Sequence, residues 1–228
     1  MSPDICGILI VDKEKGMTSH DVVNAVRGTF RVKKVGHAGT LDPMATGVLV
    51  ILLGKATKLS ATFLNQDKEY VATMKLGEKT ESGDSEGKLV ETRETDISSE
   101  MLYEVFSLFI GDIMQTPPMV SAKKFKGKPL YKLARKGIVV NREPKMISIK
   151  ELEILEVNMP YVKFRTRCGK GTYIRQLADD IGEKLGCGAH LTELRRVRSG
   201  DFSAEQAVIF TELLKMDRDT FDENVLRV

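Results

Sequence analysis

The chain has 228 residues, 42% hydrophobic and 29% charged, which is ordinary for a globular protein long enough to bury a core. Its 35 Lys and Arg nearly balance its 32 Asp and Glu, and a formal charge of +3 does not by itself indicate a nucleic-acid binder. No signal peptide and no apolar run of about 18 residues is present, so we expect a cytoplasmic protein without a membrane span.

The cysteines argue against a disulfide framework and against a metal centre. There are three of them, an odd number, and no two have the Cys-x-x-Cys spacing. Cys187 and His190 are three residues apart, but a metal site would need further ligands. We therefore expect no metal.

The first part of the chain predicts a strand and a helix. Residues 5–11 form a short apolar run that ends in a charged turn, which is typical of a strand. Thr18 or Ser19 then provides a helix cap, and the apolar residues that follow have helical spacing. These apolar residues are Val22, Val23, Val26 and Phe30.

The stretch from Gly36 to Gly54 places a carboxylate before a buried strand. Pro43 moves Asp42 out of the helical region, so Asp42 is expected on an ordered loop. The β-branched run after it predicts a buried strand. A carboxylate positioned by such a rigid scaffold can do chemistry. The alternative is an Asp-Pro turn that caps its own backbone.

The middle of the chain alternates between predicted elements and polar loops. Residues 58–65 predict a short helix, and 68–76 alternate as in a strand with one exposed face. Residues 79–87 are rich in Ser, Gly, Asp and Glu and predict a loop. A helix is expected from Ser98 or Ser99 to Phe109. Two strands, 147–157 and 161–168, and a helix, 176–185, follow later in the chain.

Residues 117–146 differ in composition from the rest of the chain. Lysines are dense there, and the aromatic residues Phe125 and Tyr131 lie among them. This mixture suits a surface that follows a phosphate backbone and stacks on bases. Two further basic clusters, at 27–34 and 195–198, fit a polyanionic partner, although each cluster alone could equally be a solvated loop.

Four blocks of sequence now combine into one pattern. In chain order they resemble those of the TruB-type tRNA pseudouridine-55 synthases, and together they span nearly the whole chain. The blocks are Gly7–Lys13 with Gly16–Ser19, then Gly36–Gly54, then Ser121–Lys124 with Tyr131 and Ala134–Arg135, and finally Gly171–Arg175 with Leu185–Leu191; Lys68-Glu69-Tyr70 also fits.

The resemblance implies conversion of uridine in the tRNA T-loop to pseudouridine, with no cofactor and no metal. Asp42 is then the catalytic carboxylate, and attack at ribose C1′, addition at uracil C6 and removal of the 2′ proton all remain open. Tyr70 stacks on the target base and serves in proton removal, while Arg175 pairs with Asp42. The other implied substrate contacts are Lys13, His37, Tyr173 and Leu194, with Lys123, Lys124, Lys126, Lys128 and Arg135 on the RNA backbone.

The resemblance also implies the fold and the domain organisation. We expect an α/β protein whose large, mixed, mostly antiparallel sheet is flanked by helices and crossed by the active-site cleft. Residues 1–210 form the catalytic domain, with a basic RNA-gripping insertion at about 120–147. Residues 211–228 are an acidic segment, and we expect the family's usual PUA-type RNA-binding domain to be absent. The expected partner is the tRNA T-arm, bound by a monomer without protein partners.

Three rival functions differ in what they require. A T-loop folding chaperone would flip uridine without needing Asp42, Tyr70 or Arg175. An N-glycosidase would need a second carboxylate, for which Asp179 and Asp180 are candidates. A guide-RNA-dependent synthase would share the core, but the basic insertion and the expected absence of the accessory domain favour the stand-alone bacterial kind.

Overall fold

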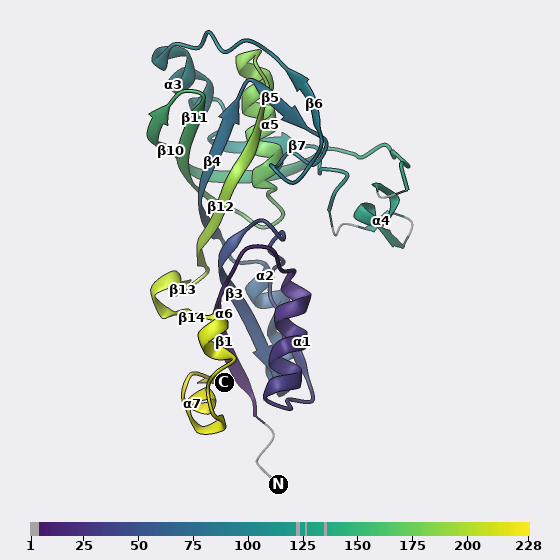
Figure 1. The fold of residues 1–228 in the computed structure, drawn as a ribbon, viewed down its shortest axis with the longest axis vertical. Helices are drawn as coiled ribbons and strands as arrows, with labels where there is room; N and C mark the ends of the chain where they lie inside the picture. The colour runs from purple at the N-terminus through teal and green to yellow at the C-terminus, as the bar shows by residue number, and fades with distance from the viewer. Residues whose placement is uncertain (1–4, 122–123, 126, 135) are drawn as a thin grey trace. The chain divides into compact units, whose positions relative to one another are not determined.

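The computed structural model describes residues 5–121, 124–125, 127–134 and 136–228. Their contacts divide the chain into two units (Figure 1). Unit 1 contains residues 1–71 and 194–228, and unit 2 contains residues 72–193. Strands β4 (Lys68–Leu76) and β12 (Ala189–Ser199) each contribute residues to both units.

Unit 1 is built from the two ends of the chain. In its sheet the strand order is β14-β1-β3-β12, with β2 beside β3 and β15 beside β1. Its N-terminal elements are β1 (Gly7–Lys13), α1 (Ser19–Thr29), β2 (Val35–His37), β3 (Thr46–Leu53), η1 (Gly54–Leu59) and α2 (Ser60–Leu64). Its C-terminal elements are β13 (Phe202–Ser203), η2 (Ala204–Gln206), β14 (Val208–Ile209), α6 (Phe210–Leu213), α7 (Arg218–Glu223) and β15 (Leu226–Arg227).

The centre of unit 1 is the antiparallel pair of β1 and β3, in register from Gly7 opposite Leu53 to Lys13 opposite Gly47. Seven of the eight residues of β3 are buried, which confirms the strand predicted after Asp42. Helix α1 begins where its sequence predicts, because Thr18 caps it and forms a capping box with Asp21. The apolar face of α1 then covers part of the unit 1 core.

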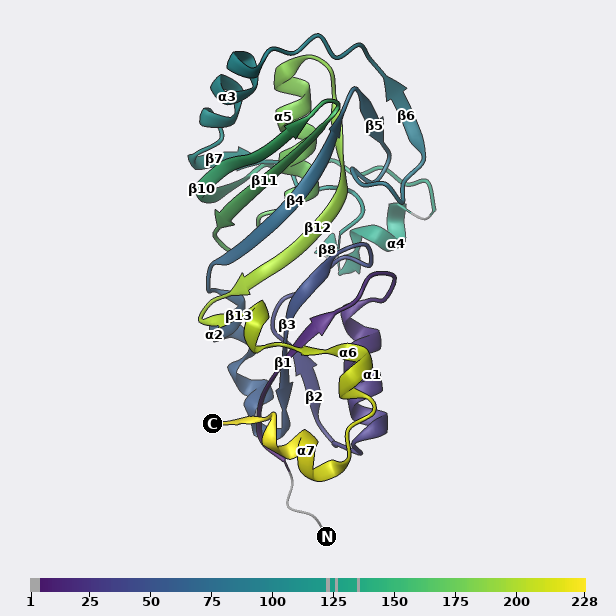
Figure 2. The same cartoon turned by 60° about the vertical axis from the view of Figure 1, so that its left-hand side comes forward.

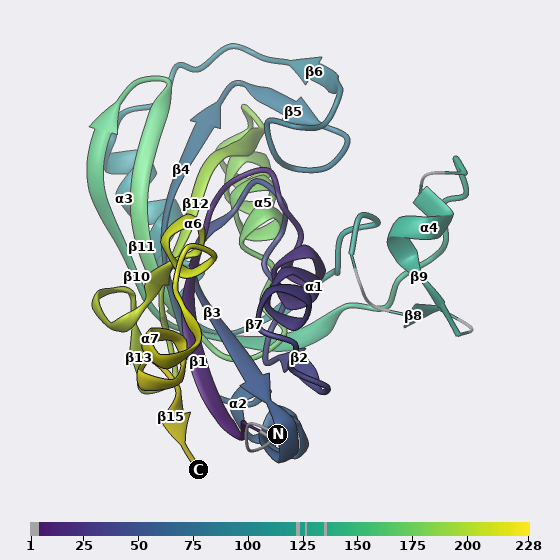
Figure 3. The ribbon, with the colours of Figure 1, turned by 60° about the horizontal axis from the view of Figure 1, so that its bottom comes forward.

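The C-terminal segment completes the core of unit 1. The ring of Phe221 is fully buried and stacks on Phe30, with 3.8 Å between ring centroids. Arg218 donates a hydrogen bond of 2.6 Å to the Phe30 carbonyl, and Leu213 is fully buried. Figure 3 shows this segment in yellow beside β1, with which β14 and β15 pair. The segment predicted as an acidic tail thus supplies apolar residues to the core.

Unit 2 is a second part of the sheet, with helices on it. The strand order is β12-β4-β11-β10-β7, and two short hairpins, β5-β6 and β8-β9, lie apart from this sheet. The elements are β5 (Glu78–Thr80), β6 (Leu89–Thr92), α3 (Ser99–Ser107), β7 (Gly111–Gln115), β8 (Lys124–Phe125), β9 (Lys128–Pro129), α4 (Leu130–Ala134), β10 (Lys145–Asn158), β11 (Tyr161–Cys168) and α5 (Ile174–Leu185).

Helices α3 and α5 lie on the same face of the unit 2 sheet (Figure 2). Alternate residues of β11 are buried, and the fully buried ring of Phe164 makes an edge contact with Phe106 of α3. Strands β1–β14 and β3–β12 pair in parallel, whereas β1–β3, β2–β3, β7–β10 and β10–β11 pair antiparallel. A mixed, mostly antiparallel sheet flanked by helices confirms the predicted fold class. Among the described residues no helix is long and apolar enough to cross a membrane.

Candidate active site

Asp42 lies in unit 1, on the loop that joins β2 to β3. Its neighbours Leu41, Met44 and Ala45 are buried, whereas Asp42 itself is half-buried. The loop leads directly into the buried strand β3, so the sequence prediction of an ordered loop before a buried strand is confirmed. A half-buried carboxylate on a fixed loop can reach a bound substrate while its backbone stays in place.

Five consecutive main-chain carbonyls, from Gly39 to Pro43, each accept a hydrogen bond. Because so many backbone groups are held from several directions, the Asp42 loop is fixed before any substrate binds. The donors are Arg196 to Gly39 and Thr40, the Ser19 hydroxyl to Leu41, the Ala45 amide to Asp42, and the Gly16 amide together with the Lys13 ammonium to Pro43.

Lys13, at the end of β1, also holds this loop. Its side chain is fully buried at the end of β1, and its ammonium donates to the carbonyls of Glu14, Met17 and Pro43, at 2.8, 2.9 and 3.3 Å. A lysine has three N–H donors, and each of these bonds uses one of them. This geometry gives Lys13 a structural role beside Asp42.

Arg195 and Arg196 correct the interpretation of residues 195–198 as a basic RNA-binding cluster. Arg196 is 1% exposed and donates to three main-chain carbonyls of unit 1. Arg195 forms an ion pair with Asp12 through both of its terminal nitrogens. These two charges are therefore used within the fold. No periodic signal in the sequence separates such an arginine from an exposed one.

Tyr70 and Leu194 are buried in unit 1. Tyr70 lies on β4 and Leu194 on β12. Burial alone is equally compatible with a core role and with a pocket lining. Their predicted contacts with the substrate base stay predictions.

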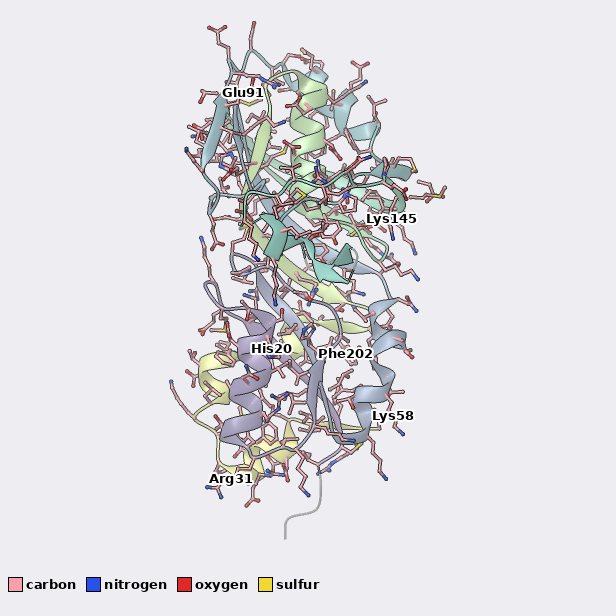
Figure 4. All side chains as sticks on the ribbon, turned by 90° about the vertical axis from the view of Figure 1, so that its right-hand side faces the viewer. His20, Arg31, Lys58, Glu91, Lys145 and Phe202 are labelled. Atoms are coloured by element: carbon pink, nitrogen blue, oxygen red, sulfur yellow. The ribbon has the colours of Figure 1, made fainter. Side chains whose placement is uncertain are left out.

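His37 ends β2, five residues before Asp42, and is half-buried. Its Nδ1 is buried and meets no hydrogen-bond partner in the part of the chain that the structure describes. Burial, followed by the charges of Arg196 and of His20 on α1 (Figure 4), lowers the pKa of the His37 imidazole below 6.5. The ring is therefore neutral near pH 7 and can offer a hydrogen bond to a bound group.

The lowered pKa of His37 predicts a pH dependence of stability. Between the folded and unfolded pKa values the unfolded chain binds more protons, so the free energy of unfolding falls as the pH drops below 6.5. His37→Gln removes this effect. The difference in melting temperature between wild type and His37→Gln should change below pH 6.5 and stay constant above it. A difference that is constant throughout the range from about pH 5 to 8 would contradict the prediction.

Arg175 lies in unit 2, at the start of α5, and is 3% exposed. Its guanidinium donates to the carbonyls of Ser82 and Val120, at 2.8 Å each, and lies 3.6 Å from a carboxylate oxygen of Asp84. Asp84 is buried too and accepts from the Ser82 hydroxyl and the Glu86 amide. The predicted pair of Asp42 and Arg175 joins one residue from each unit and stays a prediction.

Asp84 was missed by the sequence analysis, which placed it in a polar loop. Its neighbours Ser82, Gly83 and Glu86 have the composition of an exposed turn, and nothing in that pattern indicates a buried carboxylate. Leu191 of β12 bridges to Asp84, and this contact between distant segments is what buries it. Buried carboxylates need such partners.

Tyr173 is fixed through its main chain. Its amide donates to the side-chain oxygen of Gln115, and the Gln115 amide donates back to the Tyr173 carbonyl, at 2.9 and 3.1 Å. Gln115 is 2% exposed, whereas Tyr173 is half-buried. This arrangement holds the position from which α5 begins and from which Arg175 extends.

A pocket of about 410 Å³ lies beside Arg175 within unit 2. Its lining mixes polar and apolar side chains and contains charges of both signs, including Lys79, Arg142 and Asp179. Asp179 forms an ion pair with Lys79 at 3.1 Å, and Asp180 accepts from Gln176 at 2.9 Å. Asp179 is thus used in an ion pair on α5, whereas burial raises the pKa of Asp180 to about 6, so an acid role of Asp180 stays a prediction of the N-glycosidase hypothesis.

We expect substitution of Arg175 to destabilise unit 2. Arg175→Gln leaves the Asp84 carboxylate buried without its cation, which should cost about 3 kcal/mol of unfolding free energy. Adding Asp84→Asn should recover part of this loss, because the uncompensated charge is then gone. Urea unfolding of both single variants and the double variant measures the coupling. Additive losses would contradict a direct ion pair.

The basic insertion is described only in part. Lys123, Lys126 and Arg135 lie outside the described residues. Lys124 and Lys128 are placed in β8 and β9 by their backbone alone. Their predicted contacts with RNA phosphates stay predictions.

The fold and the fixed aspartate loop define a class that comparison with known proteins identifies. The family model described as TruB family pseudouridylate synthase (N terminal domain) matches residues 27–174. A second model, tRNA pseudouridylate synthase B C-terminal domain, matches residues 175–228. The chain belongs to the TruB family of pseudouridylate synthases, which confirms the predicted family and its enzyme class, an isomerase.

Individual relatives agree with this assignment. The chain is 48% identical over 210 residues to tRNA pseudouridine synthase B of Haemophilus influenzae, covering 92% of this chain and 67% of the relative. It is 48% identical over 223 residues to the protein of the same name from Syntrophotalea carbinolica, covering 97% of this chain and 73% of the relative. Among solved structures, a chain of a Cbf5-Nop10-Gar1 complex matches with a TM-score of 0.77 and 32% identity, covering 97% of this chain and 60% of that chain.

Proposed function

We propose that this chain converts uridine 55 in the T-loop of tRNA to pseudouridine, with Asp42 as the catalytic carboxylate. The glycosidic bond from ribose C1′ to N1 breaks, the uracil turns, and C1′ bonds to C5; the C5 proton leaves to water and N1 takes up a proton from water. The reaction moves no electrons to or from a carrier and transfers no group, so it calls for no cofactor. The names of the relatives support tRNA as the substrate and pseudouridine as the product.

The observation that carries the proposal is the fixed Asp42 loop. All five carbonyls from Gly39 to Pro43 are held, so the carboxylate need not be ordered when the substrate arrives. Prior ordering of a reacting group lowers the entropic part of the barrier. A protein that only bound and refolded tRNA would have no use for a carboxylate on a backbone held in this way.

The requirements of the same reaction suggest roles for the other predicted site residues. A uridine in a folded RNA loop must be extruded, so it needs an aromatic surface and an apolar contact in the site. We assign the stacking and proton removal to Tyr70, the apolar contact to Leu194 and the pocket wall to Tyr173. Arg175 pairs with the Asp42 carboxylate, and the neutral His37 contacts the loop nucleotides that the flipped base displaces.

The substrate is bound through the basic insertion at about 120–147, acting on the tRNA T-arm. We further propose that the chain works as a monomer in the cytoplasm, where unmodified tRNA is present. Residues 1–210 act as the catalytic domain in this scheme.

The insertion predicts a salt dependence of tRNA binding. Replacing Lys123, Lys124, Lys126 and Lys128 by Gln should weaken binding and make log K less steeply dependent on log salt, by roughly 0.7–0.9 for each phosphate that is no longer neutralised. Binding measured at salt concentrations from about 50 to 200 mM gives the slope. An unchanged slope would remove these lysines from the interface.

Release of tritium tests the proposed function directly. Unmodified tRNA carrying tritium at uracil C5 is incubated with the protein, and tritium in water is counted. We expect release from wild-type tRNA and none when the T-loop uridine is replaced by cytidine. Binding without any release would overturn the isomerase assignment in favour of the chaperone function.

A further inference from the structure

Arg196 is a buried cation whose side chain donates three hydrogen bonds to the main chain around the Asp42 loop. Its Nε donates to the Val48 carbonyl of β3 at 2.7 Å. Its two terminal nitrogens donate to the carbonyls of Gly39 and Thr40, at 3.1 and 3.4 Å. One guanidinium thus ties the residues before Asp42 to the strand that follows it.

The backbone around Arg196 is shaped to accommodate it. Gly47 has φ of +99°, and a Cβ atom there would lie 2.2 Å from the Arg196 carbonyl oxygen. Gly39 has φ of +109°, and a Cβ atom there would lie 3.6 Å from a terminal nitrogen of Arg196. Glycine is required at both positions by conformation, and at Gly47 also by space. β12 and β3 approach this closely because Arg196 is directly opposite Gly47 in their parallel pairing.

No carboxylate in the described part of the chain pairs with the charge of Arg196. Within the described residues no ion pair involves Arg196, so carbonyl dipoles alone solvate a guanidinium that is 1% exposed. Burying a charge without a counter-charge is unfavourable, and an apolar side chain would fill the space at lower cost. A planar fork with five donors, by contrast, can hold three carbonyls of two segments at once.

We propose that Arg196 is a positioning residue that sets the place of the Asp42 carboxylate for the isomerisation. This inference rests on the proposed function. Arg196 touches neither substrate nor reacting atoms: it acts by fixing the Gly39 and Thr40 carbonyls against β3, just before Asp42 in the chain. The effect of removing it should therefore fall on the chemical step and not on tRNA binding.

The proposal is tested by measuring turnover of two Arg196 variants, with a variant of the neighbouring Arg195 as the control. Arg196→Gln keeps one donor group and should lower kcat about 100-fold, as expected when a catalytic group is misplaced by about 1 Å. KM and the Kd for tRNA should stay within about threefold of wild type. Arg196→Lys keeps the positive charge but not the planar guanidinium with its several donors, so its kcat should lie between those of wild type and Arg196→Gln. Arg195→Gln, on the same strand, removes the ion pair with Asp12 and a long hydrogen bond of 3.5 Å to the Thr46 hydroxyl, and it should retain kcat.

A measurement independent of turnover accompanies these assays. The Arg196 charge contributes to the low pKa of His37, so an NMR titration of the His37 imidazole should give a higher pKa in Arg196→Gln than in wild type. The titration also shows that the variant is folded under the conditions of the assay.

The outcomes separate this proposal from the proposed function. If wild-type protein releases no tritium, the proposed function fails. If wild type is active and folded Arg196→Gln keeps its kcat, or loses binding as much as turnover, the positioning role fails. If Arg196→Gln does not fold, Arg196→Lys decides in the same way. If neither variant folds, Arg196 is a purely structural residue and the proposal is overturned.

Discussion

Asp42→Asn should abolish pseudouridine formation while leaving tRNA binding nearly unchanged. Asparagine preserves the shape of the side chain but removes the negative charge and the basic oxygens on which each of the three possible reactions of Asp42 depends. The hydrogen bonds that hold the loop from Lys13, Ser19 and Arg196 end on main-chain carbonyls, so they survive the substitution. We expect kcat to fall on the order of 10⁴-fold, the size of effect typical for a catalytic group.

Tritium release under single-turnover conditions measures this loss, and filter binding measures tRNA affinity. Asp201→Asn provides the control, because Asp201 is an exposed carboxylate in the turn after β12 of the same unit. Its turnover should equal that of wild type. Turnover within about tenfold of wild type in Asp42→Asn would exclude Asp42 from the chemistry.

Phe221→Ala should be the most destabilising single substitution in the C-terminal segment. It removes a fully buried ring stacked on Phe30 and leaves a cavity between α7 and the end of α1. Truncations of buried phenylalanine typically cost about 3–5 kcal/mol. Much of the stability of a domain is lost at that level, because total stabilities are about 5–15 kcal/mol.

Urea unfolding followed by circular dichroism gives this free energy. Leu226→Ala is the matched control: it lies later in the same segment and is 49% exposed. Its effect should stay within about 0.5 kcal/mol. Equal stabilities of Phe221→Ala and Leu226→Ala would show that the segment contributes little to the core of unit 1.

The spacing of apolar residues in the sequence predicted strands and helices well where a single periodicity, two for a strand or 3.6 for a helix, dominates a segment. Strands 68–76 and 161–168 have the predicted bounds, the first of them predicted from alternation, and buried residues alternate along both. The cap at Thr18 and the loop at Asp42 also followed from local chemistry, through a capping oxygen and the restriction before Pro43.

Contacts between distant segments could not be predicted in this way. The partners of Arg196 lie roughly 150 residues earlier in the chain, and those of Arg175 are in loops with no periodicity. An arginine in a charged run looks exposed, because sequence shows neither the carbonyls that it meets nor the strand that covers it. The predicted substrate contacts depended on the family resemblance, since burial of Tyr70 or Leu194 alone has no functional meaning.

The supports of the Asp42 loop also have a consequence for the timing of synthesis. Lys13 and Ser19 leave the ribosome before Asp42, but Arg196 follows it by roughly 150 residues, which takes on the order of 10–30 s at usual rates of translation. The C-terminal residues that fill the core around Phe30 emerge later still. A nascent chain therefore carries its aspartate long before it carries the arginine that holds the loop, and the loop reaches its full set of supports only after Arg196 has emerged.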